Sequence, residues 1–258
     1  MEKSFVLTHG SLQIPCVLTM PHSGQVRRVV LGVHGLGGSM NDAIQVGIAE
    51  EMALFSSAAV RFDLPAHGSS PARDNTLSLK NCRDALLAVA RWIREEFPDV
   101  EDLCIFATGF GAYVTLTALE ELTALPGRVK LVVQTPSVAM HATILSMVRR
   151  TKETLWAMDK VTIPTPRPML VTYSFYEELY RNIVLAPQPI PMLILHGEAD
   201  DYIRMEDIQN FRRINERSKL VIIPGASHQF TEEGAWDMVL DLTRDWFSFE
   251  QVLLCDWE

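Results

Sequence analysis

The chain has 258 residues, of which 48% are hydrophobic and 21% charged, and its formal net charge is −9. This composition is that of an ordinary folded protein, and it excludes a disordered chain, a coiled coil and a collagen-like fibre. The negative net charge and the absence of any run of basic residues disfavour a surface that binds nucleic acid. They also provide no electrostatic attraction to an anionic membrane.

Cysteine usage and the N-terminal residues predict a cytoplasmic protein. The four cysteines, Cys16, Cys82, Cys104 and Cys255, form no CxxC pair, which disfavours a zinc or dithiol redox site. The first residues lack the long apolar stretch of a signal peptide, and no run of 18 apolar residues occurs. We expect Cys82 and Cys104 to be buried thiols, and we expect neither a metal nor an organic cofactor.

Short apolar runs alternate with longer amphipathic segments along the chain. The runs predict strands at 4–8, 14–20, 28–34, 57–62, 103–107, 129–134, 192–196 and 219–223. Helices are predicted at 41–55, 78–97, 110–125, 205–215 and 235–249. The first two strands are expected to form an antiparallel hairpin, and the later ones are apolar on both faces, as strands covered by helices are. The pattern predicts an α/β fold with a mostly parallel central sheet flanked by helices.

The alternation of predicted strands and helices is interrupted between residues 136 and 191. This stretch contains a helical pattern at 138–158, a proline-rich bend at 163–168 and an aromatic cluster that begins at Tyr173. An insertion of this length in a compact domain is more often functional than passive. We therefore expect a single domain over 1–258 with a lid inserted at 137–190. The aromatic side chains could line an apolar pocket or pack the lid against the rest of the domain.

Two glycine-rich turns follow predicted strands. His34-Gly35-Leu36-Gly37-Gly38 follows the strand at 28–34, and its glycines allow a tight turn that presents backbone amides. Ala107-Thr108-Gly109-Phe110-Gly111 follows the strand at 103–107 and precedes a helix. The second pattern matches a small-x-nucleophile-x-Gly elbow, which holds its central residue on a sharp strand-to-helix turn.

An acid and a histidine follow the last two predicted strands. Asp200 lies in the sequence HGEADD and His228 in PGASHQF, so both are expected on loops at the carboxyl ends of strands. Open α/β sheets bind their ligands at that edge. A carboxylate beside a histidine fixes the tautomer of the ring and stabilises its protonated form.

Together these segments, with RFDLPAHGSS at 61–70, resemble the α/β-hydrolase superfamily over nearly the whole chain. The likeness is nearest to small-lidded bacterial esterases of the cinnamoyl (feruloyl) esterase type. The resemblance implies that Asp200 is the acid of a catalytic triad, that His228 is the general base, and that the amides of Leu36 and Phe110 form an oxyanion hole. It also implies a small acyl compound as ligand or substrate and a monomer or homodimer. The substrate-binding residues expected on this basis are His34, Tyr173, Phe175 and Tyr176.

The sequence departs from this family at the nucleophile. The elbow carries Gly109 where the family has Ser, Cys or Asp, and glycine has no side chain with which to attack a carbonyl. Loss of the nucleophile costs about 10⁶-fold in turnover in a comparable triad. Thr108 is adjacent, but its side chain should turn away from the tip of the elbow, and Ser137 follows the next strand without being directed at His228.

Three hypotheses remain open from the sequence. The chain could be an esterase-lineage protein with very weak hydrolysis that binds small acyl or aryl-acyl ligands under the lid. It could be an enzyme of another class, of the lyase or cofactor-free oxygenase type, that uses His228 as a general base. It could also be a ligand-binding protein without catalysis.

Overall fold

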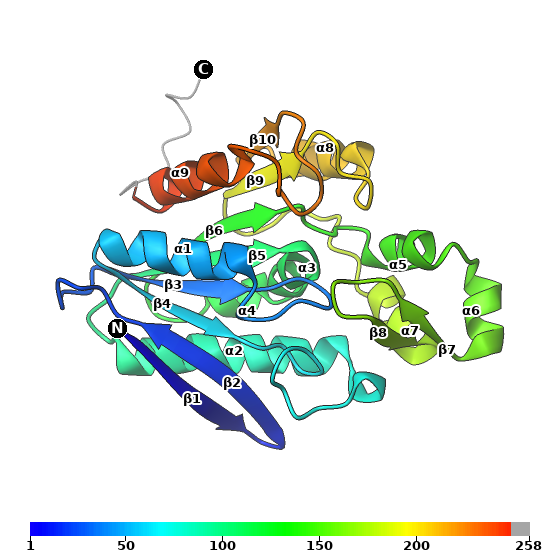
Figure 1. Ribbon diagram of the computed structural model, residues 1–258, viewed down its shortest axis with the longest axis horizontal. Coiled ribbons are helices and arrows are strands. Elements are labelled where there is room, and N and C mark those ends of the chain that lie inside the picture. Colours follow the sequence, from blue (N-terminus) through cyan, green and yellow to red (C-terminus); the bar gives the residue numbers. More distant parts are fainter. Residues whose placement is uncertain (249–258) are drawn as a thin grey trace.

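A computed structural model describes residues 1–248 (Figure 1). The predicted helix end at 249, Cys255 and the predicted domain end at 258 lie outside the described residues. Within 1–248, no helix combines the length and the apolar character needed to cross a bilayer. Cys82 and Cys104 are buried free thiols, as predicted.

A central sheet of eight strands organises the molecule (Figure 1). In chain order its strands are β1 (Glu2–His9), β2 (Leu12–Thr19), β3 (Arg28–Val33), β4 (Ser57–Phe62), β5 (Asp102–Thr108), β6 (Arg128–Gln134), β9 (Met192–Gly197) and β10 (Lys219–Ile223). They lie in the order β1-β2-β4-β3-β5-β6-β9-β10. β2 pairs antiparallel with β1 and β4, and the other pairings are parallel. The predicted hairpin and mostly parallel sheet are confirmed.

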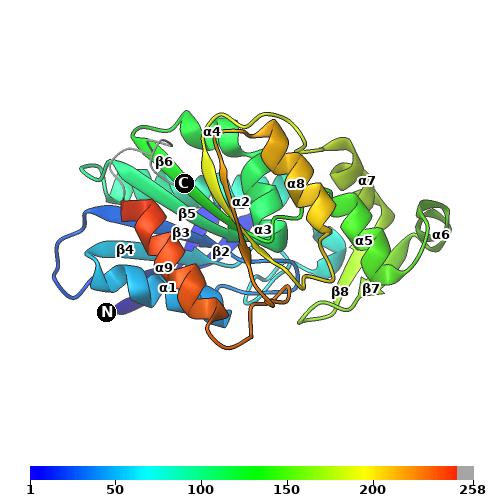
Figure 2. The same cartoon turned by 90° about the horizontal axis from the view of Figure 1, so that it is seen from above.

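Helices cover both faces of this sheet. The pair α1 (Ala43–Leu54) and α9 (Ala235–Ser248) lies on one face, whereas α2 (Leu79–Glu96), α3 (Gly109–Thr117) and α8 (Met205–Ile214) pack on the other (Figure 2). The residues of β5 contribute to both sides in turn: Ile105 packs in the core of the α2 face, and Cys104 and Phe106 pack in the core of the α1 face. Both faces of the strand are apolar because both are covered by helices.

The predicted helix at 110–125 is divided into α3 and α4 (Leu119–Thr123) at Ala118. Two threonine hydroxyls of α3 donate back to the helix backbone, Thr115 Oγ1 to Gly111 O at 2.8 Å and Thr117 Oγ1 to Val114 O at 2.8 Å. Such bonds compete with the helical pattern and bend helices.

Residues 137–190, here called the inserted segment, connect β6 to β9 and lie at one end of the sheet (Figure 1). The segment contains α5 (Met140–Val148), α6 (Lys152–Met158), β7 (Lys160–Ile163), β8 (Met169–Thr172) and α7 (Tyr173–Arg181). The predicted helix at 138–158 is therefore wrong as a single element. Its first part ends at Arg149 with φ +49°, and the Thr151 side chain caps the second part.

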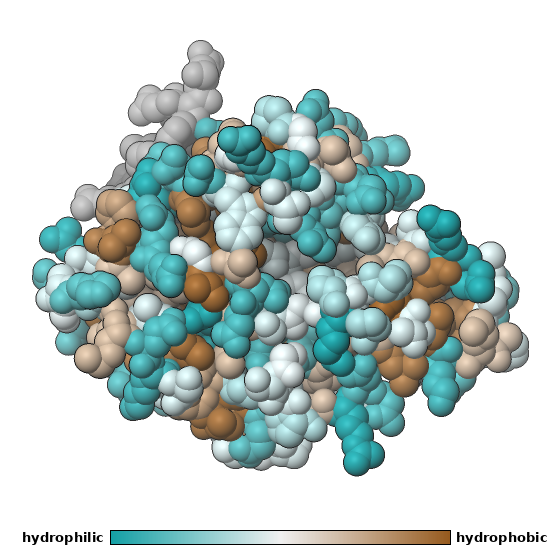
Figure 3. All heavy atoms as spheres, in the orientation of Figure 1, coloured by the Kyte–Doolittle hydropathy of each residue, from teal (hydrophilic) through white to brown (hydrophobic). Residues whose placement is uncertain are grey.

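The proline-rich bend of the inserted segment joins two strands that the sequence did not reveal. β7 and β8 pair antiparallel as a two-stranded sheet. Each strand has four residues, too few for an alternating pattern to stand out. Figure 3 shows apolar side chains gathered over the right-hand end of the face in view, and the exposed Trp156 and Met158 belong to this segment.

Candidate functional site

Gly109 forms the tip of the turn between β5 and α3. Its φ of +49° lies in the left-handed region, which glycine adopts without steric cost. Two residues later, a Cβ on Gly111 would overlap the carbonyl oxygens of Val33 and His34. Strand and helix therefore approach each other so closely here that only glycine fits at 111.

The space above Gly109 is open on the side that faces His228. A Cβ built on Gly109 would lie 3.9 Å from His228 Nε2 and 3.9 Å from Gly35 Cα, with no closer neighbour. A hydroxyl carried by that Cβ could approach Nε2 to about 3 Å, which is hydrogen-bond distance. The site thus has room for a small side chain that the chain does not supply.

Asp200 and His228 form a hydrogen-bonded pair. Asp200 Oδ2 lies 2.8 Å from His228 Nδ1, so the ring donates from Nδ1 and leaves Nε2 towards Gly109. The other carboxylate oxygen accepts from the amides of Tyr202 and Ile203, each at 2.9 Å. The two amides thus hold the carboxylate that orients the imidazole, and the Asp200 side chain is fully buried.

Asp200 is the ionised carboxylate of this pair. Burial acts to raise the pKa of the Asp200 carboxyl, but the hydrogen bond and charge of His228, together with the two backbone amides, lower the pKa overall. A second histidine, His196, lies with Nδ1 3.8 Å from Asp200 Oδ2, and burial lowers its pKa. His196 is therefore neutral at pH 7, and His228 is the ring that bonds the carboxylate.

A cavity of about 520 Å³ opens between Gly109 and His228. Leu36 and Phe110 are among its lining residues. The Phe110 amide lies in the first turn of α3, where backbone N–H groups have no partner within the helix. The described lining residues include no lysine or arginine.

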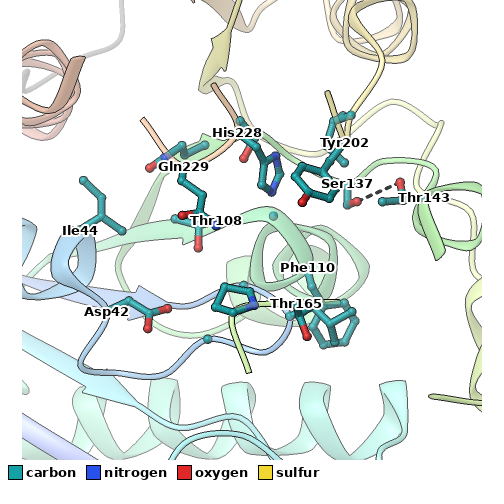
Figure 4. A pocket seen from close by; sticks show the side chains of 18 of the residues that line it. Asp42, Ile44, Thr108, Phe110, Ser137, Thr143, Thr165, Tyr202, His228 and Gln229 are labelled. Atoms are coloured by element: carbon teal, nitrogen blue, oxygen red, sulfur yellow. Dashed lines mark hydrogen bonds between the residues drawn. The ribbon is translucent and has the colours of Figure 1, made fainter. Parts of the chain in front are cut away.

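The cavity extends to both sides of His228 (Figure 4). Ser137, Thr143 and Tyr202 lie on the side here called the α5 arm, and Asp42, Ile44, Thr108 and Gln229 lie on the side here called the α1 arm (Figure 4). Other lining residues of the cavity include Gln134, Met140, Met147, Ile203 and Trp236. The inserted segment adds Pro164, Thr165 and Pro166 to the wall.

Two hydroxyl side chains, Ser137 and Thr108, also line the cavity. Ser137 Oγ donates to Thr143 Oγ1 at 3.2 Å, so it is engaged within the α5 arm. Thr108 lies one residue before the tip of the elbow and lines the α1 arm.

His34, expected to bind substrate, does not line this cavity and is completely buried. Its Nδ1 donates to Gly35 O at 2.8 Å and its Nε2 accepts from Leu64 N at 3.1 Å. Burial lowers the pKa of His34 to about 4, so the ring is neutral at pH 7. The expected ligand contact is corrected: His34 holds two loops together beneath the site.

The three aromatic residues expected in the substrate pocket are also absent from the cavity lining. Phe175 is 1% exposed and packs edge-on against the Phe110 ring, with centroids 5.8 Å apart. Tyr176 is 2% exposed and stacks with Tyr173 at 5.9 Å. Of the two alternatives left open for these side chains, packing of the inserted segment is the one observed, because α7 turns them towards its neighbours.

The sequence did not single out several lining residues, notably Asp42, Gln134 and Trp236. One signal was available for Gln134, a polar residue that follows the apolar stretch 131–133 and ends its strand at the ligand-binding edge of the sheet. Within residues 1–248, no three His, Cys, Asp or Glu side chains gather as metal ligands would.

The fold is similar to those of several solved structures. The chain is similar to a putative hydrolase from Agrobacterium vitis S4, with a TM-score of 0.80, 18% identity and coverage of 96% of this chain and 98% of that one. It is similar to Est1E from Butyrivibrio proteoclasticus with bound ferulic acid, with a TM-score of 0.82, 17% identity and coverage of 93% and 96%. The esterase domain of a Rhodothermus marinus protein matches with a TM-score of 0.72, 16% identity and coverage of 95% and 97%.

Sequence comparison agrees with the fold. No curated protein matches the chain. The profile described as the alpha/beta hydrolase family matches residues 29–242, which include the elbow, the acid and the histidine. The match spans most of the chain, and the protein belongs to the alpha/beta hydrolase family.

Proposed function

We propose that the protein binds small acyl or aryl-acyl compounds in the cavity between Gly109 and His228, and that its serine-esterase activity is very weak. In this proposal Asp200 and His228 are the acid and base of an esterase triad, and Leu36 and Phe110 supply oxyanion amides. The inserted segment acts as a lid over the ligand. The bound ferulic acid of the structural neighbour Est1E supports the choice of an aryl-acyl ligand.

One observation carries the proposal: the empty Cβ position on Gly109 lies 3.9 Å from His228 Nε2. In an esterase, the base must reach the nucleophile within hydrogen-bond distance, and the geometry of the surrounding groups meets that need. Only the attacking atom is missing. Without it no acyl-enzyme can form. A loss of about 10⁶-fold in turnover corresponds to an activation barrier that is higher by about 8 kcal/mol.

The test combines binding and turnover in one sample. We would titrate the native chain with phenyl butyrate by calorimetry and follow phenol release by chromatography. The proposal expects saturable binding with phenol release near the uncatalysed rate. Absence of binding would overturn the proposal, and so would rapid turnover by the native chain.

A second candidate function is non-covalent general-base catalysis by His228. It is favoured by the 2.8 Å bond from Nδ1 to Asp200, which keeps Nε2 able to accept a proton from water or substrate. Under this reading the native chain has an activity, of a lyase or oxygenase type, that His228→Ala abolishes. Under the binding reading, the native chain has no such activity for the substitution to abolish.

A further inference from the structure

The outer end of the inserted segment carries α6 and differs in charge from the rest of the protein. Figures 1 and 2 both show α6 at one extreme of the longest axis of the molecule. Residues 137–190 contain six Lys and Arg and four Asp and Glu, which gives a formal charge of +2 within a chain of −9. The net charge of the whole chain predicts no attraction to an anionic surface, but this segment is locally cationic.

Three cations next to α6 form no ion pair with any described residue. Arg149 and Arg150 lie in the turn between α5 and α6, Lys160 begins β7 directly after α6, and all three are exposed. Arg150 Nη1 donates to the backbone oxygen of Arg149 at 3.4 Å, which leaves its charge uncompensated. The carboxylates of this stretch, Glu153 and Asp159, are outnumbered. These cations are therefore free to meet an anionic partner.

Large apolar and aromatic side chains are exposed beside these cations. Trp156 is 67% exposed and Met158, at the end of α6, is 49% exposed, whereas Leu155 of the same helix is 1% exposed. Trp156 lies one turn after Lys152, so the two share a face of the helix. The Lys152 ammonium lies 4.4 Å from the centroid of the Tyr180 ring, and Tyr180 is itself exposed. The helix thus anchors itself through Leu155 and presents its indole to solvent.

An anionic lipid surface matches this combination of groups. Tryptophan is favoured at the boundary between headgroups and acyl chains, and lysine and arginine side chains reach the anionic headgroups around it. A second copy of the chain that met this end to end would bring the same unpaired cations together, which is unfavourable. A protein partner usually buries about 800 Å² on each side, more than the end of a short helix offers, whereas lipid headgroups rearrange around a small surface.

We propose that residues 149–160 dock the protein on anionic lipid surfaces. Trp156 and Met158 enter the headgroup region, and the three unpaired cations bind lipid phosphates and carboxylates. The same inserted segment supplies residues 164–166 to the wall of the cavity, so docking brings the cavity close to the lipid. The docking does not depend on which compound the cavity binds.

The test is sedimentation of the full chain with sucrose-loaded vesicles, made of phosphatidylcholine alone or of phosphatidylcholine and phosphatidylserine in equal parts. The native chain should partition at least about tenfold more strongly onto the vesicles with phosphatidylserine, and added salt should weaken this binding. Arg149→Gln/Arg150→Gln should lower the partition coefficient about tenfold or more, since each cation near an anionic surface contributes about fivefold. Trp156→Ala should also lower it about tenfold, because the apolar surface of the indole is lost.

A matched control removes the same charge elsewhere. Arg27→Gln/Arg91→Gln changes two exposed arginines outside the inserted segment and should alter the partition coefficient by less than about twofold. All these variants change exposed side chains, so each should keep the native melting temperature. Vesicles with phosphatidylserine and brominated acyl chains should quench the fluorescence of the native chain, and the quenching should be smaller in Trp156→Phe.

Several outcomes would overturn the proposal. Equal partitioning onto both kinds of vesicle would do so, as would no partitioning or native-like binding by Arg149→Gln/Arg150→Gln. Binding of polyglutamate but of neither vesicle would overturn it in favour of an acidic protein partner. A dimer in sedimentation velocity that Trp156→Ala dissociates, without vesicle binding, would overturn it in favour of a second copy. Each of these outcomes leaves the proposed function standing, because residues 149–160 do not line the cavity.

Discussion

Substitution of Gly109 by serine should create an esterase in one step. The built Cβ meets nothing closer than 3.9 Å, and one of its two nearest atoms is His228 Nε2. A full triad is about 10⁶-fold more active than one without its nucleophile, and a misplacement of about 1 Å costs about 10²-fold. We therefore expect Gly109→Ser to accelerate hydrolysis by between about 10⁴-fold and 10⁶-fold over the native chain.

The substitution also has a cost in stability. A non-glycine residue at φ +49° loses about 1–2 kcal/mol relative to glycine, because its Cβ crowds the backbone. Gly109→Ala carries the same strain without a hydroxyl and is the matched control. Both variants should show the same fall in the free energy of unfolding in urea.

The assay is release of p-nitrophenol from p-nitrophenyl butyrate, corrected for the uncatalysed rate. Gly109→Ser should be active, whereas Gly109→Ala and the double variant Gly109→Ser/His228→Ala should remain near the native level. If Gly109→Ser folds but hydrolyses no faster than Gly109→Ala, the reasoning about the elbow is refuted.

Three further predictions follow from the same geometry. In the Gly109→Ser background, Asp200→Asn should lower the turnover number about 10⁴-fold by removing the carboxylate that fixes the His228 tautomer; a loss below tenfold in steady-state kinetics would contradict the assigned role. The pKa of His34 is lowered to about 4, so the stability it confers is complete above pH 6.5 and is lost as the pH falls from 6.5 towards 4. Between pH 7 and pH 5 this should lower the free energy of unfolding by about 2 kcal/mol. In His34→Gln, the fall in the free energy of unfolding between these two pH values, measured by urea titration, should be smaller by that amount. Gly111→Ala should destabilise the fold by about 2–3 kcal/mol because its Cβ would overlap two carbonyl oxygens, and an unchanged urea midpoint would show that the turn can relax.

The parts of the site that the sequence predicted depend on short-range rules. Gly109 follows a buried strand and precedes a helix, so its place at the edge of the sheet follows from local pattern alone. Asp200 and His228 follow two neighbouring parallel strands, β9 and β10, whose carboxyl ends must lie together. Sheet topology then makes their 2.8 Å contact possible.

The parts that the sequence missed depend on how distant segments pack. Tyr176 lies in an aromatic run that could equally have faced a ligand, and only the orientation of α7 against the rest of the fold buries it. Asp42 has the residue type and position of an ordinary helix cap, and its turn towards the cavity is visible only in three dimensions. The hairpin of β7 and β8 was hidden because its strands are short and joined by prolines.

The central claim, that residue 109 stands at the nucleophile position facing His228, is tested most directly by covalent labelling. A fluorophosphonate reacts with an activated serine when the hydroxyl oxygen bonds to phosphorus, fluoride leaves and the base takes the proton. Peptide mapping by mass spectrometry should find the adduct at position 109 in Gly109→Ser, and no adduct in the native chain or in Gly109→Ser/His228→Ala. An unlabelled Gly109→Ser, or a native chain labelled at Ser137 or Thr108, would contradict the claim.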